Sequence, residues 1–160
     1  MHEVSTGLFL GNRHDSRKIP FNSKPWAVVH ASHEAHRERL GYRKGAPRNS
    51  EYYTARRGQH LYVNIITKDL PTGYHQALFT DSLAFIKEHR EQDYSVLICS
   101  DKGGNRPSGI ALVYLAQERL IPHESFDEAL AELRQHYPLC TLRSGLAAYL
   151  RHNWEYFIQR

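Results

Sequence analysis

The residues best suited to chemistry lie between 96 and 116, which read VLICSDKGGNRPSGIALVYLA. An apolar run ends at Cys99, a glycine-bearing stretch follows, and a second apolar run begins after Pro107. This order predicts a buried strand, a tight turn and a helix, because proline suits the first helical turn. The N–H groups of such a turn converge on one point, where Arg106 adds a planar donor fork. The pattern therefore predicts a cradle for phosphate or another tetrahedral oxyanion.

This candidate cradle has a simpler competing interpretation. Its residues are Ser100, Asp101, Lys102, Gly103, Gly104, Asn105 and Arg106. An ordinary strand-to-helix connection would also use glycines in its turn and leave its arginine in solvent, and local chemistry alone does not separate the two interpretations. A Walker-type nucleotide loop is excluded, because no Gly-Lys-Ser/Thr follows the turn at the required spacing.

The rest of the chain alternates short β-rich runs with helical ones, which favours an α/β domain. The expected strands are Leu8–Leu10, Trp26–His30, Leu61–Ile66 and Ser95–Cys99. The expected helices are Tyr74–Glu91, Pro107–Arg119, Ser125–Tyr137 and Leu142–Ile158. We expect one domain over residues 1–160, with a central, mainly parallel sheet flanked by helices and the cradle between a central strand and a helix.

The segment 33–59 is polar and rich in breakers, so we expect a long loop with one short helix around Glu34–Leu40. Its basic residues are Arg37, Arg39, Arg43, Lys44, Arg48, Arg56 and Arg57. A solvated surface loop is the simpler interpretation. The alternative is a basic rim that steers an anionic ligand, with Tyr42, Tyr52 and Tyr53 available for stacking on a ring or base.

The segment from Val96 to Ala116 resembles, without a gap, the signature of the cysteine-dependent protein phosphatases, in their dual-specificity branch. That signature is His-Cys, five residues, Arg and then Ser or Thr. Ser100 falls on the nucleophilic cysteine, Arg106 on the signature arginine and Gly103 on the loop glycine. The resemblance implies a phosphotyrosine-phosphatase-like fold, in which residues 100–106 bind the phosphate of a phosphomonoester.

Other parts of the chain extend this resemblance. The stretch from Leu61 to Asp69 and the helix after it are similar to the family's strand, acid loop and helix, which places Asp69 on the general-acid aspartate. The segment 8–11 resembles the opening strand and 27–30 the second. The segment 33–57 looks like an insert of microbial and phage members. The implied partner is a phosphorylated protein or another phosphomonoester.

Three departures from the family signature bear on activity. The family attacks phosphorus with a thiolate, and a serine hydroxyl cannot be ionised near pH 7 without a strong adjacent base. Cys99 stands where the family has histidine, and Pro107 where it has serine or threonine. We therefore expect phosphate binding with little or no turnover. Both a natural pseudophosphatase and a Cys→Ser substrate-trapping form of an active phosphatase fit Ser100, and the sequence leaves both open.

Two other groups of residues could carry chemistry. Cys99 as nucleophile would need six residues before Arg106, and neighbouring strand residues point to opposite faces, so we expect it to be a small buried residue. His30, His33 and His36 lie three apart, whereas zinc sites on a helix prefer a spacing of four. We expect no metal and no cofactor, and place His33 and His36 at the mouth of the pocket as an alternative.

Composition limits the possible partners. The chain has 160 residues, a net charge of +4 and a pI near 9.1, which is a mild bias toward anionic ligands. Nucleic acid or a nucleotide is a weaker alternative, since no dense basic motif is present. No apolar run is long enough for a membrane span, and no secretory signal is recognisable. Two cysteines do not build a disulfide framework, so we expect a cytoplasmic location.

Overall fold

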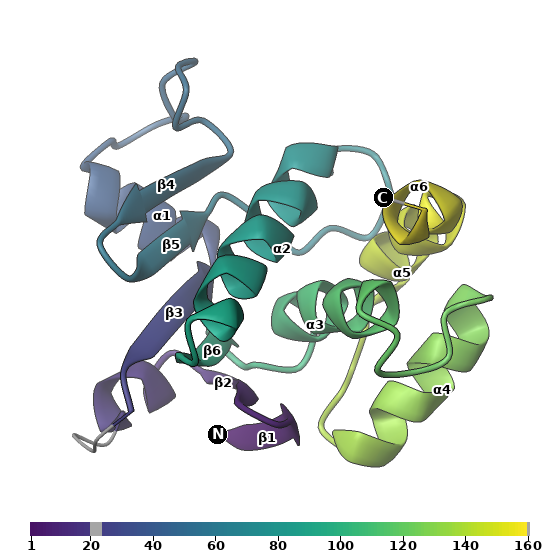
Figure 1. Ribbon diagram of the computed structural model, residues 1–160. Helices are drawn as coiled ribbons and strands as arrows, with labels where there is room; N and C mark the ends of the chain where they lie inside the picture. Colours follow the sequence, from purple (N-terminus) through teal and green to yellow (C-terminus); the bar gives the residue numbers. More distant parts are fainter. Residues whose placement is uncertain (20–23, 160) are drawn as a thin grey trace.

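The computed structural model describes residues 1–19 and 24–159, and it is built around one six-stranded sheet (Figure 1). The strands are β1 His2–Ser5, β2 Leu8–Asn12, β3 Trp26–Ala31, β4 Thr54–Arg57, β5 His60–Val63 and β6 Ser95–Ser100. Their order in the sheet is β1-β2-β6-β3-β5-β4. The four inner strands pair in parallel, and the two edge strands pair antiparallel with their neighbours. The expected mainly parallel sheet is confirmed.

Helices cover the two faces of this sheet unequally. They are the 3-10 helix η1 Asp15–Lys18 and the α-helices α1 His33–Leu40, α2 Gln76–Glu91, α3 Arg106–Gln117, α4 Phe126–His136, α5 Ser144–His152 and α6 Trp154–Ile158. Helices α2 to α6 lie on one face, and α1 lies on the other, where η1 packs against β2 and β6 (Figure 1). Among the described ranges, no helix has the length and apolar character that crossing a membrane requires.

The side chains of β6 alternate between two cores because successive residues of a strand point to opposite faces. Val96 and Ile98 belong to the large core under α2 to α6. Leu97 and Cys99 belong to a small cluster on the face of α1 and η1. Ser100 is the next residue in this alternation, so it turns toward the α3 side as the strand ends.

The segment 33–59 holds more regular structure than the sequence indicates. The helix expected around 34–40 is present as α1, with Ser32 accepting a hydrogen bond from Ala35 N at its start and Gly41 ending it in the left-handed region. The expectation of a loop after it is wrong in part, because Thr54–Arg57 forms the edge strand β4 on β5. A single buried residue, Ala55, anchors this strand. Its polar sequence, TARR, hides the strand pattern.

The two ends of the chain differ from expectation in smaller ways. Strand β1 precedes the expected first strand and pairs with β2 through a register shift between Glu3 and Ser5. The single helix expected over 142–158 is two helices, α5 and α6, which meet at Asn153. The Nδ2 of Asn153 donates to the carbonyl of Tyr149, 2.9 Å away, and so competes with the helical backbone pattern at this point.

Candidate functional site

The loop Ser100–Arg106 connects β6 to α3, and three contacts fix its first half. Ser100 is 4% exposed, and its Oγ accepts a hydrogen bond from Gly103 N at 3.2 Å. Gly103 has a φ of +82°, and a Cβ there would lie 2.7 Å from the carbonyl oxygen of Gly11. Tyr137 donates its hydroxyl to the Gly103 carbonyl at 3.0 Å. The loop is therefore held between the end of β2 and the residue after α4.

The second half of the loop is held by two neighbouring segments. Thr141 N donates to the Gly104 carbonyl at 2.8 Å, and Arg143 N donates to Asn105 Oδ1 at 2.8 Å. The Nδ2 of Asn105 donates to Thr67 Oγ1, 3.3 Å away, in the segment 64–75 between β5 and α2. Asn105 thus ties together the loop, the start of α5 and the segment that follows β5.

Arg106 is the buried charge at the start of α3, with 9% of its surface exposed. Its Nη1 donates to the carbonyl of Ile65 at 3.2 Å and lies 3.8 Å from Glu34 Oε2. The same Oε2 of Glu34 accepts from Ser32 Oγ at 3.0 Å. Partial burial raises the pKa of Glu34, but hydrogen bonds from its own backbone N–H and from Ser32, together with the Arg106 charge, bring the pKa below its usual value. The guanidinium therefore stands in a defined place beside an ionised carboxylate.

Two hollows open at this loop, and Ser100 and Asp101 contribute to both. The first has a volume of about 480 Å³, and we call it the acid-side hollow because the segment that carries Asp69 borders it. Its walls include Thr67, Lys102, Asn105, Arg106, Thr141 and Arg143. The second, the α1 hollow, has a volume of about 320 Å³ on the other side. Its walls include Arg13, Arg17, His30, Glu34, Arg39 and Tyr62.

The sequence matches no family model and no curated protein. Solved structures do match: human DUSP28 has 17% sequence identity and a TM-score of 0.68, covering 99% of this chain and 94% of that chain. A human tyrosine phosphatase-like serine/threonine/tyrosine-interacting protein has 15% identity and a TM-score of 0.66, covering 99% and 97%. PTPMT1 in complex with PI(5)P has 14% identity and a TM-score of 0.67, covering 99% and 97%. The chain has the dual-specificity phosphatase fold.

Within this phosphatase fold, Asp69 lies at the rim of the acid-side hollow. Its side chain is 85% exposed, and Oδ1 lies 3.6 Å from Arg143 Nη2. Its carbonyl accepts from Ser144 Oγ at 3.3 Å. Gly145 allows this approach, because a Cβ there would lie 2.8 Å from both the carbonyl carbon of Asp69 and the carbonyl oxygen of Leu70. The described side chains that line the hollow include Arg143 but not Asp69.

Cys99 faces away from the loop, as strand alternation predicts. It is 1% exposed and packs with Val28 and Leu97 on the α1 side. Its Sγ lies 3.9 Å from His30 Nδ1. Burial, followed by the charges of Asp15 and Asp101, raises the pKa of the thiol to about 12. A protonated thiol on the opposite face of the strand cannot replace Ser100 as the group inside the loop.

The three histidines that lie three apart in the sequence each have a different partner. His36 is buried, and its ring contacts the Tyr42 hydroxyl at 2.7 Å and the Glu51 carbonyl at 2.8 Å. His33 Nδ1 lies 2.7 Å from Asn64 Oδ1. Of these three histidines, His30 lines the α1 hollow, and neither His33 nor His36 is among the described residues that line the two hollows. The alternative that placed His33 and His36 at the mouth of the pocket is therefore not seen.

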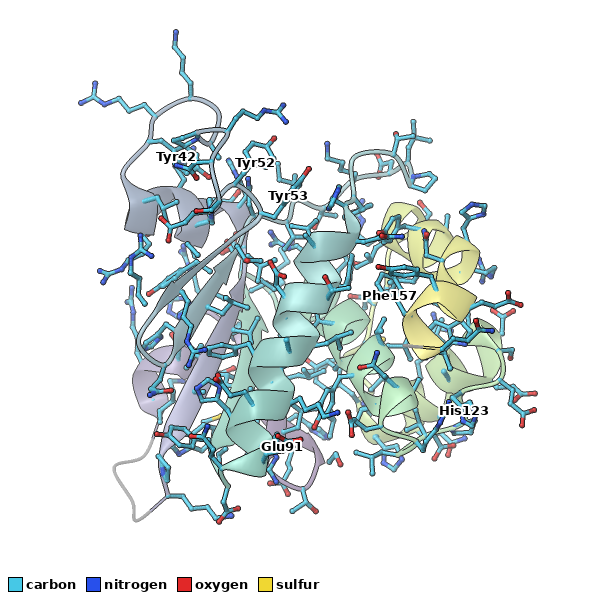
Figure 2. All side chains as sticks on the ribbon, turned by 45° about the horizontal axis from the view of Figure 1, so that its top comes forward. Tyr42, Tyr52, Tyr53, Glu91, His123 and Phe157 are labelled. Carbon is cyan, nitrogen blue, oxygen red and sulfur yellow. The ribbon has the colours of Figure 1, made fainter. Side chains whose placement is uncertain are left out.

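The tyrosines between α1 and β5 each contact a neighbouring side chain, and Figure 2 shows where Tyr42, Tyr52 and Tyr53 lie. The hydroxyl of Tyr42 contacts His36. The ring of Tyr53 stacks on His75, with 4.2 Å between the ring centroids, and the Arg48 guanidinium lies 4.4 Å from the centroid of Tyr52. The stack of Tyr53 on His75 therefore links the 33–59 segment to the residues before α2, whereas Tyr42 and Tyr52 pack on side chains of the segment itself.

Sequence reasoning missed the residues that brace the loop from a distance. Tyr137, Thr141 and Thr67 lie between 34 and 38 positions away from their partners in the chain. No motif marks them, because their role depends on the tertiary arrangement. In the sequence, Glu34 is one of the acidic residues of the polar segment 33–59, and its 3.8 Å distance from Arg106 in the structure shows that it lies at the site.

Proposed function

We propose that this chain binds a phosphomonoester in the loop Ser100–Arg106 and does not hydrolyse it. The observation that carries the proposal is the hydroxyl of Ser100, which stands inside the loop where the resembling phosphatases have a thiolate. It accepts a hydrogen bond from Gly103 N, and it is 4% exposed. A phosphorylated protein or another phosphomonoester is the proposed partner.

The loop supplies three kinds of attraction for a phosphate. Backbone N–H groups of a tight loop at a helix start favour an anion, and the dipole of α3 adds positive potential there. Arg106 offers a fork of donors whose position is fixed by the carbonyl of Ile65 and the carboxylate of Glu34. Lys102 adds a further positive charge at the rim. These groups bind the dianion without needing a nucleophile.

Hydrolysis fails at the first step in this proposal, because nothing removes the proton of Ser100. Within the described residues, its hydrogen-bond partner is Gly103 N–H, which is a donor and accepts no proton. A serine hydroxyl needs a base to become a nucleophile near neutral pH. Pro107 has no hydroxyl, and Ser108, one position later, is fully buried with no hydrogen-bond partner among the described residues.

A second candidate function is an active dual-specificity or tyrosine phosphatase, of which this chain would be a Cys→Ser form. The fixed guanidinium of Arg106 and the placement of Asp69 beside Arg143 favour it. With cysteine at 100, the thiolate would attack phosphorus and form a phosphocysteine. Asp69 would protonate the leaving oxygen, and water would then release phosphate. The ester would be a phosphomonoester of the same class.

The named structural neighbours are compatible with both functions. One is called a phosphatase-like, interacting protein, which matches a binding role. Another is described in complex with PI(5)P, so this fold also receives a non-protein phosphomonoester. We also propose a cytoplasmic location, because Cys99 and Cys140 are both buried free thiols, which a reducing compartment preserves.

The test compares the chain with its Ser100→Cys variant. Titration calorimetry measures phenyl phosphate binding to the chain, to Arg106→Lys and to the surface control Arg56→Lys. Hydrolysis of the same ester is followed for the chain and for Ser100→Cys. We expect binding without turnover in the chain and at least tenfold weaker binding in Arg106→Lys, because one ammonium cannot replace the fork. Arg56→Lys should bind normally.

The outcomes separate the two functions. Ser100-dependent turnover by the chain itself would overturn the binding proposal. Turnover only in Ser100→Cys, abolished by Arg106→Lys in that background, would show that the scaffold is a competent phosphatase and that Ser100 is its one lesion. Absence of turnover in both forms, with phenyl phosphate still bound, would reject the second candidate and leave a phosphate-binding pseudoenzyme.

A further inference from the structure

The α1 hollow is a second place for ligand at the same loop. It lies on the sheet face that carries α1 and η1, and Ser100 and Asp101 connect it to the acid-side hollow. A phosphate held by the loop therefore stands next to both hollows. The group attached to that phosphate can extend into either one, so the chemistry of the α1 hollow bears on which ligand fits.

We propose that the α1 hollow binds a second phosphate of the same ligand, so that the preferred ligand is a small bisphosphorylated molecule. This inference rests on the proposed phosphate-binding function of the loop. Three arginines carry it: Arg13 and Arg17 come from the end of β2 and from η1, and Arg39 comes from α1. The segment from the end of β2 through η1 and the helix α1 are separate parts of the chain, and both contribute arginines to the lining of the hollow.

These three guanidinium groups have donors to spare. In residues 1–19 and 24–159, none of them forms an ion pair with a carboxylate, whereas Arg57 and Arg151 each pair with one. A guanidinium fork binds a phosphate through two parallel hydrogen bonds. Arg39 also lies near His60, the hydrogen-bonding neighbour of His30, since its charge adds to the effect of burial in lowering the pKa of His60.

Carboxylates also line the α1 hollow, and they limit the size of the effect. Glu34 is already engaged by Ser32 and by the charge of Arg106. Glu38 and Asp101 are exposed at the rim, where solvent screens them. The α1 hollow itself is lined by three arginines and these three carboxylates, and the excess of positive charge comes from the acid-side hollow beside it, so that six basic side chains face three carboxylates over both hollows. The basic ones are Arg13, Arg17, Arg39, Lys102, Arg106 and Arg143. A second phosphate is therefore favoured, but by a moderate factor.

The floor and size of the α1 hollow indicate a small ring-bearing ligand rather than a protein segment. His30 and Tyr62 present stacked rings with centroids 4.5 Å apart and planes 3° from parallel. Burial, with a contribution from the charge of His60, lowers the pKa of His30 to about 4, so the floor is neutral near pH 7. A volume of about 320 Å³ accepts one ring-sized group.

Two matched ligand pairs test this proposal by titration calorimetry at physiological ionic strength. Adenosine 3′,5′-bisphosphate is compared with adenosine 5′-monophosphate, and fructose 1,6-bisphosphate with fructose 6-phosphate. We expect at least one bisphosphate to bind about tenfold more tightly than its monophosphate. The triple variant Arg13→Ala, Arg17→Ala, Arg39→Ala should reduce this preference to about twofold or less. It should leave monophosphate affinity within about twofold.

A charge-matched control separates the hollow from the overall charge. The control removes Arg56, Arg134 and Arg151, which lie on β4, α4 and α5 away from the hollow, and it should keep the full preference. An equal loss in both triple variants would overturn the proposal, because general attraction would explain it. Thermal melts check that each variant folds.

Failure of this inference is distinguishable from failure of the proposed function. If neither monophosphate binds in a manner that depends on Arg106, the proposed function fails. If the monophosphates bind but neither bisphosphate is preferred, only the second phosphate site is overturned. If neither small bisphosphate binds more tightly than its monophosphate, but a doubly phosphorylated peptide binds more tightly than its singly phosphorylated form, the inference of a small ligand is overturned.

Discussion

The variant Gly103→Ala tests whether the shape of the loop, rather than its charge alone, makes the site. Two separate penalties meet at this position. The φ of +82° lies in the left-handed region, which costs an L-residue about 1–2 kcal/mol. An added Cβ would also lie 2.7 Å from the oxygen and 2.8 Å from the carbon of the Gly11 carbonyl. Because these are backbone atoms of β2, they cannot rotate away.

The chain offers a matched control in Gly41→Ala. Gly41 has a φ of +81°, but a Cβ there would meet nothing within 4 Å. Alanine keeps the N–H that Gly41 donates to the Arg37 carbonyl at the end of α1. The control therefore carries the dihedral penalty without the clash, and the difference between the two variants isolates the cost of forcing the loop away from β2.

We expect a loss of about 1–2 kcal/mol for Gly41→Ala and about 2–5 kcal/mol for Gly103→Ala, since overpacking adds about 1–3 kcal/mol. For a chain of this size, about 2–4 °C of melting temperature accompanies each kcal/mol. Calorimetric melts should therefore show a clearly larger decrease for Gly103→Ala. Phenyl phosphate affinity should fall at least about tenfold in Gly103→Ala and stay unchanged in Gly41→Ala. Equal melting temperatures with unchanged affinity would refute the reasoning.

Three further predictions follow from single contacts. Glu34→Gln should tighten phenyl phosphate binding a few-fold, because it removes a negative charge 3.8 Å from Arg106 while the bond to the Ile65 carbonyl still holds the guanidinium; weaker binding in calorimetry would contradict this. Tyr149→Phe should leave the melting temperature unchanged or raise it, since the buried hydroxyl has no partner among the described residues. Burial lowers the pKa of His30 from an ordinary value of 6.5 to about 4 in the folded chain. The unfolded chain therefore takes up a proton first, and stability is lost as the pH falls from 6.5 toward 4. In melts over this pH range, His30→Asn should make the melting temperature depend less on pH.

The sequence was sufficient for the elements that carry continuous apolar runs. The β6 strand and the helix after Pro107 were expected within one or two residues of their observed bounds, since both are buried almost throughout. The β4 strand was missed for the opposite reason. It is an edge strand with one buried side chain, Ala55, so neither alternation nor an apolar run reveals it.

The sequence predicts the turn at 100–106, but it does not predict the distant residues that hold this turn in place. The turn at 100–106 has its own signature, because glycines and an arginine must lie at fixed spacings for a backbone cradle to form. The contacts that fix it come from elsewhere: Gly11 on β2, Tyr137 after α4 and Thr67 after β5. Each contact involves a residue type with many other uses, so only the tertiary arrangement assigns it to the loop.

The neighbouring residues Cys99 and Ser100 show that a thiol can act in the loop only if it stands at position 100. A single step along β6 exchanges one face of the sheet for the other. Cys99 therefore lies among Val28 and Leu97 on the α1 side, where burial raises the pKa of its thiol to about 12. Ser100 lies inside the loop and accepts from Gly103 N. The Gly103 N–H meets a hydroxyl at this position, and the thiol of Cys99 lies on the other face of the strand, so the arrangement supports our proposal of binding without hydrolysis.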